Sequence, residues 1–346
     1  MSARMVFDLV DPAVLTQYIR AYDNEIMRNQ MALGAWLPDV QNPELEYRIN
    51  RAAFQDVDTA EFRAFDTQPR MTGRQGFSRI RGELPPLSRQ IALTEEDTLR
   101  LRALGSADGN AALISQIYND AERMARSVKM RLEVARGQLL TTGKVTINEN
   151  GFVMEADFGM SATHLPTAST AWSNVASDIL SDLLSWTQLY VDDNGFEPGM
   201  IVCSRTVLSY MLLNTKMREA AAFAGTTPAR INLETVAAIF AANGLPPVML
   251  YDTKARINGV QTPIIPADKV LLLPPPEHPM GSTQYGVTAE AMKLAGKNMI
   301  TQMEMPGIVV VNLENDNPVQ TFTLATAIAM PIMGDPNAVI CADVIP

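Results

Sequence analysis

The chain has 346 residues, of which 47% are hydrophobic and 19% charged, enough for two or three domains and a large core. Its net charge of −10 argues against bulk affinity for nucleic acid or anionic membranes. No apolar run reaches transmembrane length and the N-terminus lacks a signal-peptide pattern, so we expect a protein that is made and used in a cytoplasm.

The first 46 residues are predicted to form an arm. Pro12 can begin a helix, and the apolar residues after it recur at helical spacing on one face, namely Val14, Leu15, Tyr18, Ile19, Tyr22 and Ile26. Farther along, Pro38 and Pro43 prevent a regular helix.

Residues 47–92 differ in composition from the rest of the chain. They hold eight arginines, five acids and no lysine, a net +3 inside an acidic protein. Apolar residues are sparse, and Pro69, Gly73 and Gly76 lie in the middle. We predict two extended strands joined by a glycine-containing loop. Because so few apolar groups cannot build their own core, we expect this hairpin to project and lie on another surface. A flexible surface loop is the alternative.

The arginines of this hairpin have three explanations: contact with DNA, pairing with acidic surface on neighbouring copies, or ordinary solvated charge. A DNA-binding role lacks a recognised fold and interleaved lysines. The rigid arginine fork binds carboxylates through paired hydrogen bonds, and acids are plentiful in this chain. We therefore predict intersubunit contacts by the arginines near the tip and on the returning strand: Arg70, Arg74, Arg79 and Arg81.

Two helices are predicted next. Thr94 can cap a short helix within 93–105, with Asp97 three residues on. Between 114 and 140 apolar residues recur at steps of three and four, which predicts an amphipathic helix roughly 40 Å long.

The ends and the polar face of the long helix also follow from the pattern. Asn110 is the expected N-cap, and Gly143 is the expected stop. The polar residues between the apolar ones, including Asp120, Glu133 and Arg136, are predicted to form a solvated face.

The remainder mixes strands and helices. Asn150-Gly151 predicts a type I′ turn inside a hairpin over 144–159. Strands alternate with helices from 166 to 309, which indicates an α/β unit. The chain then returns to apolar strands, and we expect those within 319–345 to form a sheet with the 144–158 hairpin, packed on the long helix.

No catalytic or metal-binding frame is recognisable. His164 and His278 are the only histidines, and neither has a second ligand at metal spacing. Residues 137–145 only superficially resemble a phosphate loop: the spacing is wrong and they follow a helix end rather than a helix start. Cys203 and Cys341 lie in apolar runs, which predicts buried free thiols without an intrachain disulfide in a reducing compartment.

Four stretches carry a resemblance to a known family: LLTTGKVTINENGFVMEADFGM after the long helix, AWSN at 171–174, YDTKARINGVQTPIIPADKVLLLP at 251–274, and TFTLATAIAMPIMGDPNAVICADVI at 321–345. In this order, with the arm and hairpin before them, they resemble tailed-bacteriophage major capsid proteins of the HK97 fold, closest to the lambda-like capsid protein E family.

The resemblance implies an α+β architecture. A long spine helix over 114–140 would pack on a sheet beside an extended β-hairpin loop and an α/β axial domain. The parts would be an N-terminal arm at 1–46, an extended loop at 47–92, an axial domain at 166–309, and a peripheral domain at 93–165 and 310–346.

The function implied is self-assembly. Copies would form pentamers and hexamers of an icosahedral head that encloses double-stranded DNA without sequence-specific binding, with no cofactor, metal, catalytic site or membrane. We expect a separate scaffolding protein and a portal, and lambda-like members often add a decoration protein. Assembly would take place in the host bacterial cytoplasm and end in the virion. Some members crosslink through a lysine, but 47–92 has none, so we expect no covalent crosslink.

Two other functions remain as alternatives from the residues alone. An α/β enzyme would need a convergent polar site that the sequence does not reveal. A nucleic-acid-binding protein would show steep salt dependence of binding.

Overall fold

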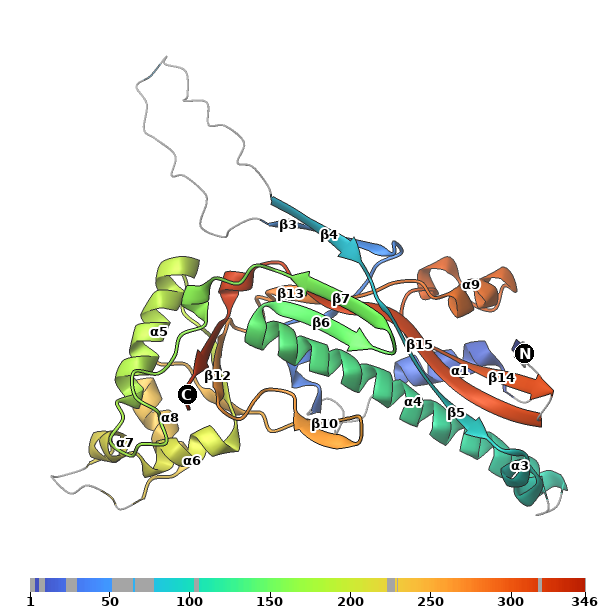
Figure 1. The fold of residues 1–346 in the computed structure, drawn as a ribbon, viewed down its shortest axis with the longest axis horizontal. Coiled ribbons are helices and arrows are strands. Elements are labelled where there is room, and N and C mark those ends of the chain that lie inside the picture. The colour runs from blue at the N-terminus through green and yellow to red at the C-terminus, as the bar shows by residue number, and fades with distance from the viewer. Residues whose placement is uncertain are drawn as a thin grey trace. The chain divides into compact units, whose positions relative to one another are not determined.

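A computed structural model describes residues 4–5, 10–22, 30–51, 65, 78–102, 106–222, 228, 230–316 and 319–345 (Figure 1). The chain divides into two compact units. The first comprises Met1–Tyr47, Gly82–Arg136 and Ser282–Ile332, and the second comprises Arg48–Arg81, Gly137–Gly281 and Met333–Pro346.

A six-stranded sheet forms the centre of the first unit. Its strand order is β1-β14-β15-β13-β2, and β5 also pairs with β15. The strands are β1 (Arg4–Met5), β2 (Asp39–Gln41), β5 (Pro86–Leu93), β13 (Gly281–Tyr285), β14 (Val309–Asp316) and β15 (Val319–Met333). β14 and β15 run antiparallel, with Val310 opposite Ala325, whereas β13 and β2 are parallel.

The long helix α4 (Ser106–Thr142) packs on this sheet. Its buried stripe shares a core cluster with residues of β5, β13, β14 and β15, and its members include Leu113, Ile117, Ala121, Val128 and Leu132. At about 1.5 Å per residue, the 37 residues of α4 make it longer than predicted. It begins four residues before the expected cap at Asn110, and it ends as predicted at Gly143, whose φ is +69°.

The polar face of α4 is not solvated throughout, which corrects the sequence-based prediction. Asp120, Glu133 and Arg136 are buried in the folded chain. Periodicity assigned all three to the outer face. For Glu133 and Arg136, segments distant in sequence cover that face and supply hydrogen-bond partners, namely Leu33, Asp39 and Thr283.

Smaller helices complete the first unit: α1 (Pro12–Ala21), η1 (Ala32–Ala35), α3 (Glu95–Arg102), α9 (Ala289–Gly296) and η3 (Gln302–Glu304). Asp11 caps α1, and Thr94 and Asp97 cap α3 as predicted. The predicted apolar face of α1 is only partly buried: Leu15 and Ile19 lie in the core, but Val14 and Tyr18 are exposed.

The second unit is built on a four-stranded sheet of order β16-β12-β8-β9. Its strands are β8 (Met200–Cys203), β9 (Val248–Leu250), β12 (Lys269–Leu273) and β16 (Ile340–Asp343). Helices accompany them: α5 (Ile179–Asn194), α6 (Arg205–Leu213), α7 (Thr215–Ala220) and α8 (Leu233–Ala242), with the short η2 (Ala162–His164) and η4 (Pro336–Ala338).

The C-terminal strands therefore separate, contrary to the prediction of one sheet. β15 lies in the sheet on which α4 packs, as expected, but β16 pairs antiparallel with β12, with Cys341 opposite Leu271. The hairpin of β6 (Lys144–Glu149) and β7 (Phe152–Asp157) forms its own two-stranded sheet. The short turn of η4 separates β15 from β16, and apolar pattern alone does not tell which partner each strand chooses.

The turn prediction at Asn150-Gly151 is confirmed. Asn150 and Gly151 have positive φ values of 51° and 79°, as a type I′ turn requires. A second hairpin, β10 (Lys254–Ile257) with β11 (Val260–Pro263), turns in the same way at Asn258-Gly259. Cys203 and Cys341 are free and buried in the sheet of the second unit.

The predicted projecting hairpin is present at its base. β3 (Glu46–Arg51) pairs with β4 (Ser78–Glu83) in a separate two-stranded sheet. The glycine at position 82 on β4 leaves room for the Tyr47 side chain of β3. A Cβ at Gly82 would lie 2.6 Å from the Tyr47 hydroxyl oxygen. Most of the segment between the two strands lies outside the described residues.

Candidate functional site

The four predicted contact arginines belong to this hairpin. Arg70 and Arg74 lie outside the described residues. Arg79 and Arg81 are on β4, and Arg81 is exposed. An intersubunit role for the four stays a prediction, since the structure holds one copy of the chain.

The base of the hairpin is held by polar contacts with β13. The Asn42 backbone N–H donates to the Tyr285 carbonyl oxygen at 2.8 Å. The Asn42 side-chain amide donates to Gln284 Oε1 at 2.9 Å and to the Glu46 carbonyl oxygen at 3.1 Å. Leu84 N–H donates to the carbonyl oxygen of Leu45 at 2.8 Å. The chain just before β3 and just after β4 is thereby fixed in the first unit.

A buried charge cluster on α4 contacts β2 and β13, the strands next to this base. Arg136 uses a different nitrogen for each of three partners: Nε donates to Thr283 Oγ1 at 2.8 Å, Nη1 to Glu133 Oε2 at 3.1 Å, and Nη2 to Asp39 Oδ1 at 2.5 Å. Glu133 also accepts from the Leu33 backbone N–H at 2.9 Å. One guanidinium thus connects α4, β13 and β2.

Burial and charge act in opposite directions on this cluster. Burial acts to lower the pKa of Arg136, but the carboxylates of Asp39 and Glu133 outweigh burial, so that pKa is raised. Burial, assisted by the Asp39 charge, raises the pKa of Tyr285. The guanidinium therefore stays charged and compensated, as a buried cation must.

Sequence reasoning missed this cluster. The available signal was a pair of opposite charges, Glu133 and Arg136, next to the buried apolar positions Leu132 and Ala135. An i,i+3 pair of this kind also occurs on fully exposed helix faces, so the sequence alone did not distinguish the two situations.

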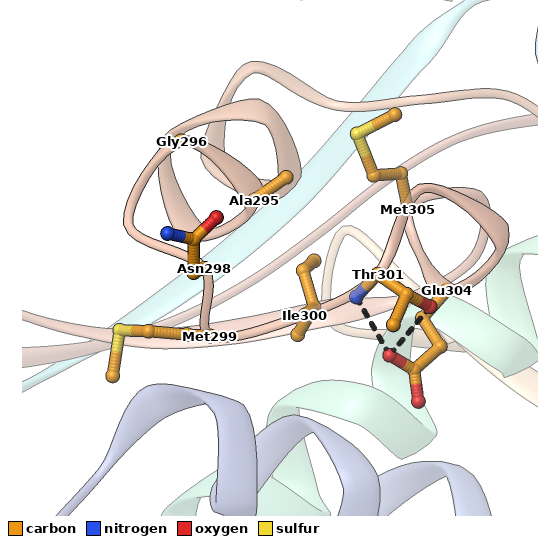
Figure 2. A pocket seen from close by; sticks show the side chains of 8 residues that line it. All are labelled: Ala295, Gly296, Asn298, Met299, Ile300, Thr301, Glu304 and Met305. Carbon is orange, nitrogen blue, oxygen red and sulfur yellow. Dashed lines mark hydrogen bonds between the residues drawn. The ribbon is translucent and has the colours of Figure 1, made fainter.

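A pocket of about 540 Å³ lies between α9 and η3 in the first unit. Figure 2 shows its lining: Ala295, Gly296, Asn298, Met299, Ile300, Thr301, Glu304 and Met305. Glu304 accepts from the backbone N–H and hydroxyl of Thr301, and the backbone hydrogen bond lowers its pKa. Glu304 is the only carboxylate among the lining residues, and it is committed to this turn. The lining therefore offers no pair of titratable groups for acid–base catalysis.

Arg20 binds the backbone next to this pocket. Its Nε and Nη1 donate to the carbonyl oxygens of Ile308 and Glu304 at 3.1 and 2.5 Å. These two hydrogen bonds fix the backbone between η3 and β14. The guanidinium also lies close to Gly307, where a Cβ would be 3.2 Å from Arg20 Nη2. Its partners are backbone groups, as expected for a structural arginine.

His164 is the best placed histidine for chemistry, but its contacts are structural. Its ring is buried, with Nδ1 2.9 Å from the Val339 carbonyl oxygen and Nε2 2.7 Å from Asp193 Oδ2. These contacts join η2, the end of α5 and the start of β16. Its contacts include no hydroxyl or thiol nucleophile, and His278 contacts the Phe196 ring.

The described residues contain no cluster of three or more histidine, cysteine or acidic side chains arranged to hold a metal ion. Over the same part of the chain, no helix is both long and apolar enough to cross a bilayer.

Two hairpins carry exposed apolar side chains close to their turns. Val153 on β7 is 71% exposed and Val260 on β11 is 65% exposed, each next to its Asn-Gly turn. Isolated exposed apolar residues are ordinary. At hairpin tips they are suited to packing against another molecule.

A family model described as phage major capsid protein E matches residues 13–344. No curated protein matches the chain.

Two solved structures share the fold over almost their entire lengths. A putative prophage capsid protein from E. coli CFT073 has a TM-score of 0.63 at 12% identity, covering 99% of this chain and 100% of that one. A phage-related protein from Bordetella bronchiseptica RB50 has a TM-score of 0.57 at 15% identity, covering 99% and 98%.

Proposed function

The chain belongs to the phage major capsid protein E family, and from this we propose that its copies assemble into pentamers and hexamers of an icosahedral phage head around double-stranded DNA. The family match over 13–344 is the observation that carries the proposal. The HK97-like α+β fold, with its long helix on a sheet, supports the same structural role.

The physical properties of the subunit suit a shell protein. In the part of the chain that the structure describes, β3 and β4 pair only with each other, and a two-stranded hairpin is marginally stable alone in water. Burial on a neighbouring copy would supply the missing stabilisation. The net charge of −10 would let packaged DNA lie inside the shell without being held tightly.

Within this proposal the sequence divides by role. Residues 1–46 would act as the arm that links capsomers. The hairpin within 47–92 would be the loop that lies on a neighbour, whereas β5 at the end of that range pairs with β15 in the central sheet. Residues 166–309 would surround the capsomer axis, and 93–165 with 310–346 would form the periphery. The arginines Arg70, Arg74, Arg79 and Arg81 would pair with carboxylates of other copies.

The partners and the location follow from the same role. We propose that the subunit works with a scaffolding protein and a portal, and with a decoration protein if one covers this shell. It would assemble in the bacterial cytoplasm and function in the virion, without catalysis and without a cofactor.

Electron microscopy of the purified full-length chain tests the proposal. Uniform polyhedral shells are expected, either from the subunit alone or after co-expression with a scaffolding protein. Protein that stays monomeric under both conditions would count against the capsid role. Retention on DNA with a steep loss of affinity in salt would instead favour the nucleic-acid-binding alternative.

A further inference from the structure

We infer that Arg136, together with Glu133 and Asp39, is a positioning cluster that fixes the segment 37–46, through which the chain enters the β3–β4 hairpin. This inference rests on the proposed shell function, in which the hairpin reaches a neighbouring copy. It adds a specific control over assembly: residues that touch no neighbour determine whether the hairpin can reach one.

The cluster acts on the chain that leads into the hairpin. Asp39 lies on β2, and seven residues later the chain enters β3 at Glu46. Thr283 binds the Arg136 guanidinium and donates its hydroxyl to the Leu37 carbonyl oxygen at 2.9 Å. Its backbone N–H donates to the carbonyl oxygen of Pro38 at 2.8 Å. The guanidinium thus fixes both a side chain and, through Thr283, the backbone of this segment.

The same segment is fixed again nearer the hairpin. Asn42 bonds to Tyr285 and Gln284 on β13 and to the Glu46 carbonyl at the start of β3. Polar contacts therefore run without a gap from α4 to the first residue of β3. A change at Arg136 has a direct physical route to the base of the hairpin.

An ordinary stabilising role does not explain the choice of residues. A buried ion pair is often no more stabilising than apolar side chains of similar volume, whereas its hydrogen bonds demand one geometry. Arg136 donates from three nitrogens to groups on three elements. The lysine ammonium is one point charge without the planar fork, so it cannot reproduce these directions.

The accessibility of Asp39 allows a mild test. Its side chain is 59% exposed, whereas those of Arg136 and Glu133 are buried. Replacing its charge should leave the core intact, because water can solvate the altered group. Asp39→Asn therefore separates positioning from folding better than a change at Arg136.

The experiment compares full-length Asp39→Asn, Asp39→Glu and Arg136→Lys with two controls. Glu197→Gln removes an exposed acid in the second unit. Ile300→Val trims a core residue beside α9, away from the hairpin base, and lowers stability without touching the cluster. Hydrogen exchange of 39–49 is measured on unassembled subunits, melting temperature by circular dichroism, and shell formation by electron microscopy.

We expect Asp39→Asn to melt no lower than Ile300→Val, to exchange several-fold faster over 39–49, and to form few or irregular shells. Asp39→Glu should restore both readouts, and the two controls should form shells normally. Arg136→Lys should show the larger effect if it folds; if it does not, Asp39→Asn alone decides.

Unchanged exchange in Asp39→Asn, or faster exchange with normal shells, overturns the inference. So does an assembly defect in Ile300→Val as large as that in Asp39→Asn, because loss of stability would then suffice. If the parent itself forms no shells, the proposed function fails, whereas the exchange measurement still reports whether the cluster holds the segment.

Discussion

Glu133 on α4 accepts a hydrogen bond from the backbone N–H of Leu33 at 2.9 Å, across 100 residues of sequence. The carboxylate is buried, and its other oxygen binds Arg136. A helix position that periodicity assigned to solvent is therefore a junction between the spine helix and the N-terminal segment.

Replacing Glu133 by Ala should lower the free energy of unfolding by about 3–5 kcal/mol, because it leaves Arg136 partly uncompensated and the Leu33 N–H without its acceptor. Denaturant unfolding of the unassembled subunit measures this. Glu96→Ala is the matched control: Glu96 pairs with Arg100 on an exposed face of α3, and such pairs contribute about 0–1 kcal/mol. Equal losses of unfolding free energy in the two variants would show that the buried cluster stabilises the subunit no more than an exposed ion pair does.

Replacing Gly137 by Ala should destabilise the second unit, although alanine favours helices by about 1 kcal/mol. A Cβ at this position would lie 2.4 Å from Ile264 Cγ2 and 2.8 Å from the Ile264 carbonyl oxygen. Displacing backbone is costly, so we expect a net loss of about 1–3 kcal/mol.

Gly296→Ala provides the control for this substitution. Gly296 ends α9, and a Cβ there would meet nothing within 4 Å. Its thermal melting point should stay the same or rise slightly. A rise in the melting point of Gly137→Ala would contradict the close approach of Ile264.

The two thiols should be inert in the folded subunit. Burial, with a smaller contribution from Asp252, raises the pKa of Cys203 to about 12, and burial raises the pKa of Cys341 to about 12. A raised pKa favours the neutral thiol, so at pH 8 only about one thiol in ten thousand would be the reactive thiolate. Labelling by a disulfide reagent should be absent from native protein and complete in denaturant; rapid native labelling would contradict the burial of these strands.

Replacing Arg70, Arg74, Arg79 and Arg81 together by Ala should leave a soluble, folded subunit that fails to form shells or forms shells that dissociate in raised salt. A single exposed pair contributes about 0–1 kcal/mol, but contacts repeated on every copy add up over a closed shell. Sedimentation and electron microscopy across a salt series measure the effect. Normal, salt-resistant shells would identify these arginines as solvated charge.

The features that the sequence predicted correctly are local ones, set by residues close together in the chain. The stripe of α4, the Asn-Gly turn at 150–151 and the cap at Thr94 each depend on residues within a few positions. The order of the recognised stretches was sufficient to indicate the family, which the match over 13–344 confirms.

Only the tertiary structure decided the pairing of β16 with β12 rather than with the strands beside α4. It alone showed that Glu133 and Arg136 are buried. The sequence of an apolar strand does not specify its pairing partner, because several sheet edges would bury the strand equally well. A charged residue on a helix is exposed or buried according to what folds over it, and here Leu33, Asp39 and Thr283, distant in sequence, supply both the cover and the hydrogen bonds.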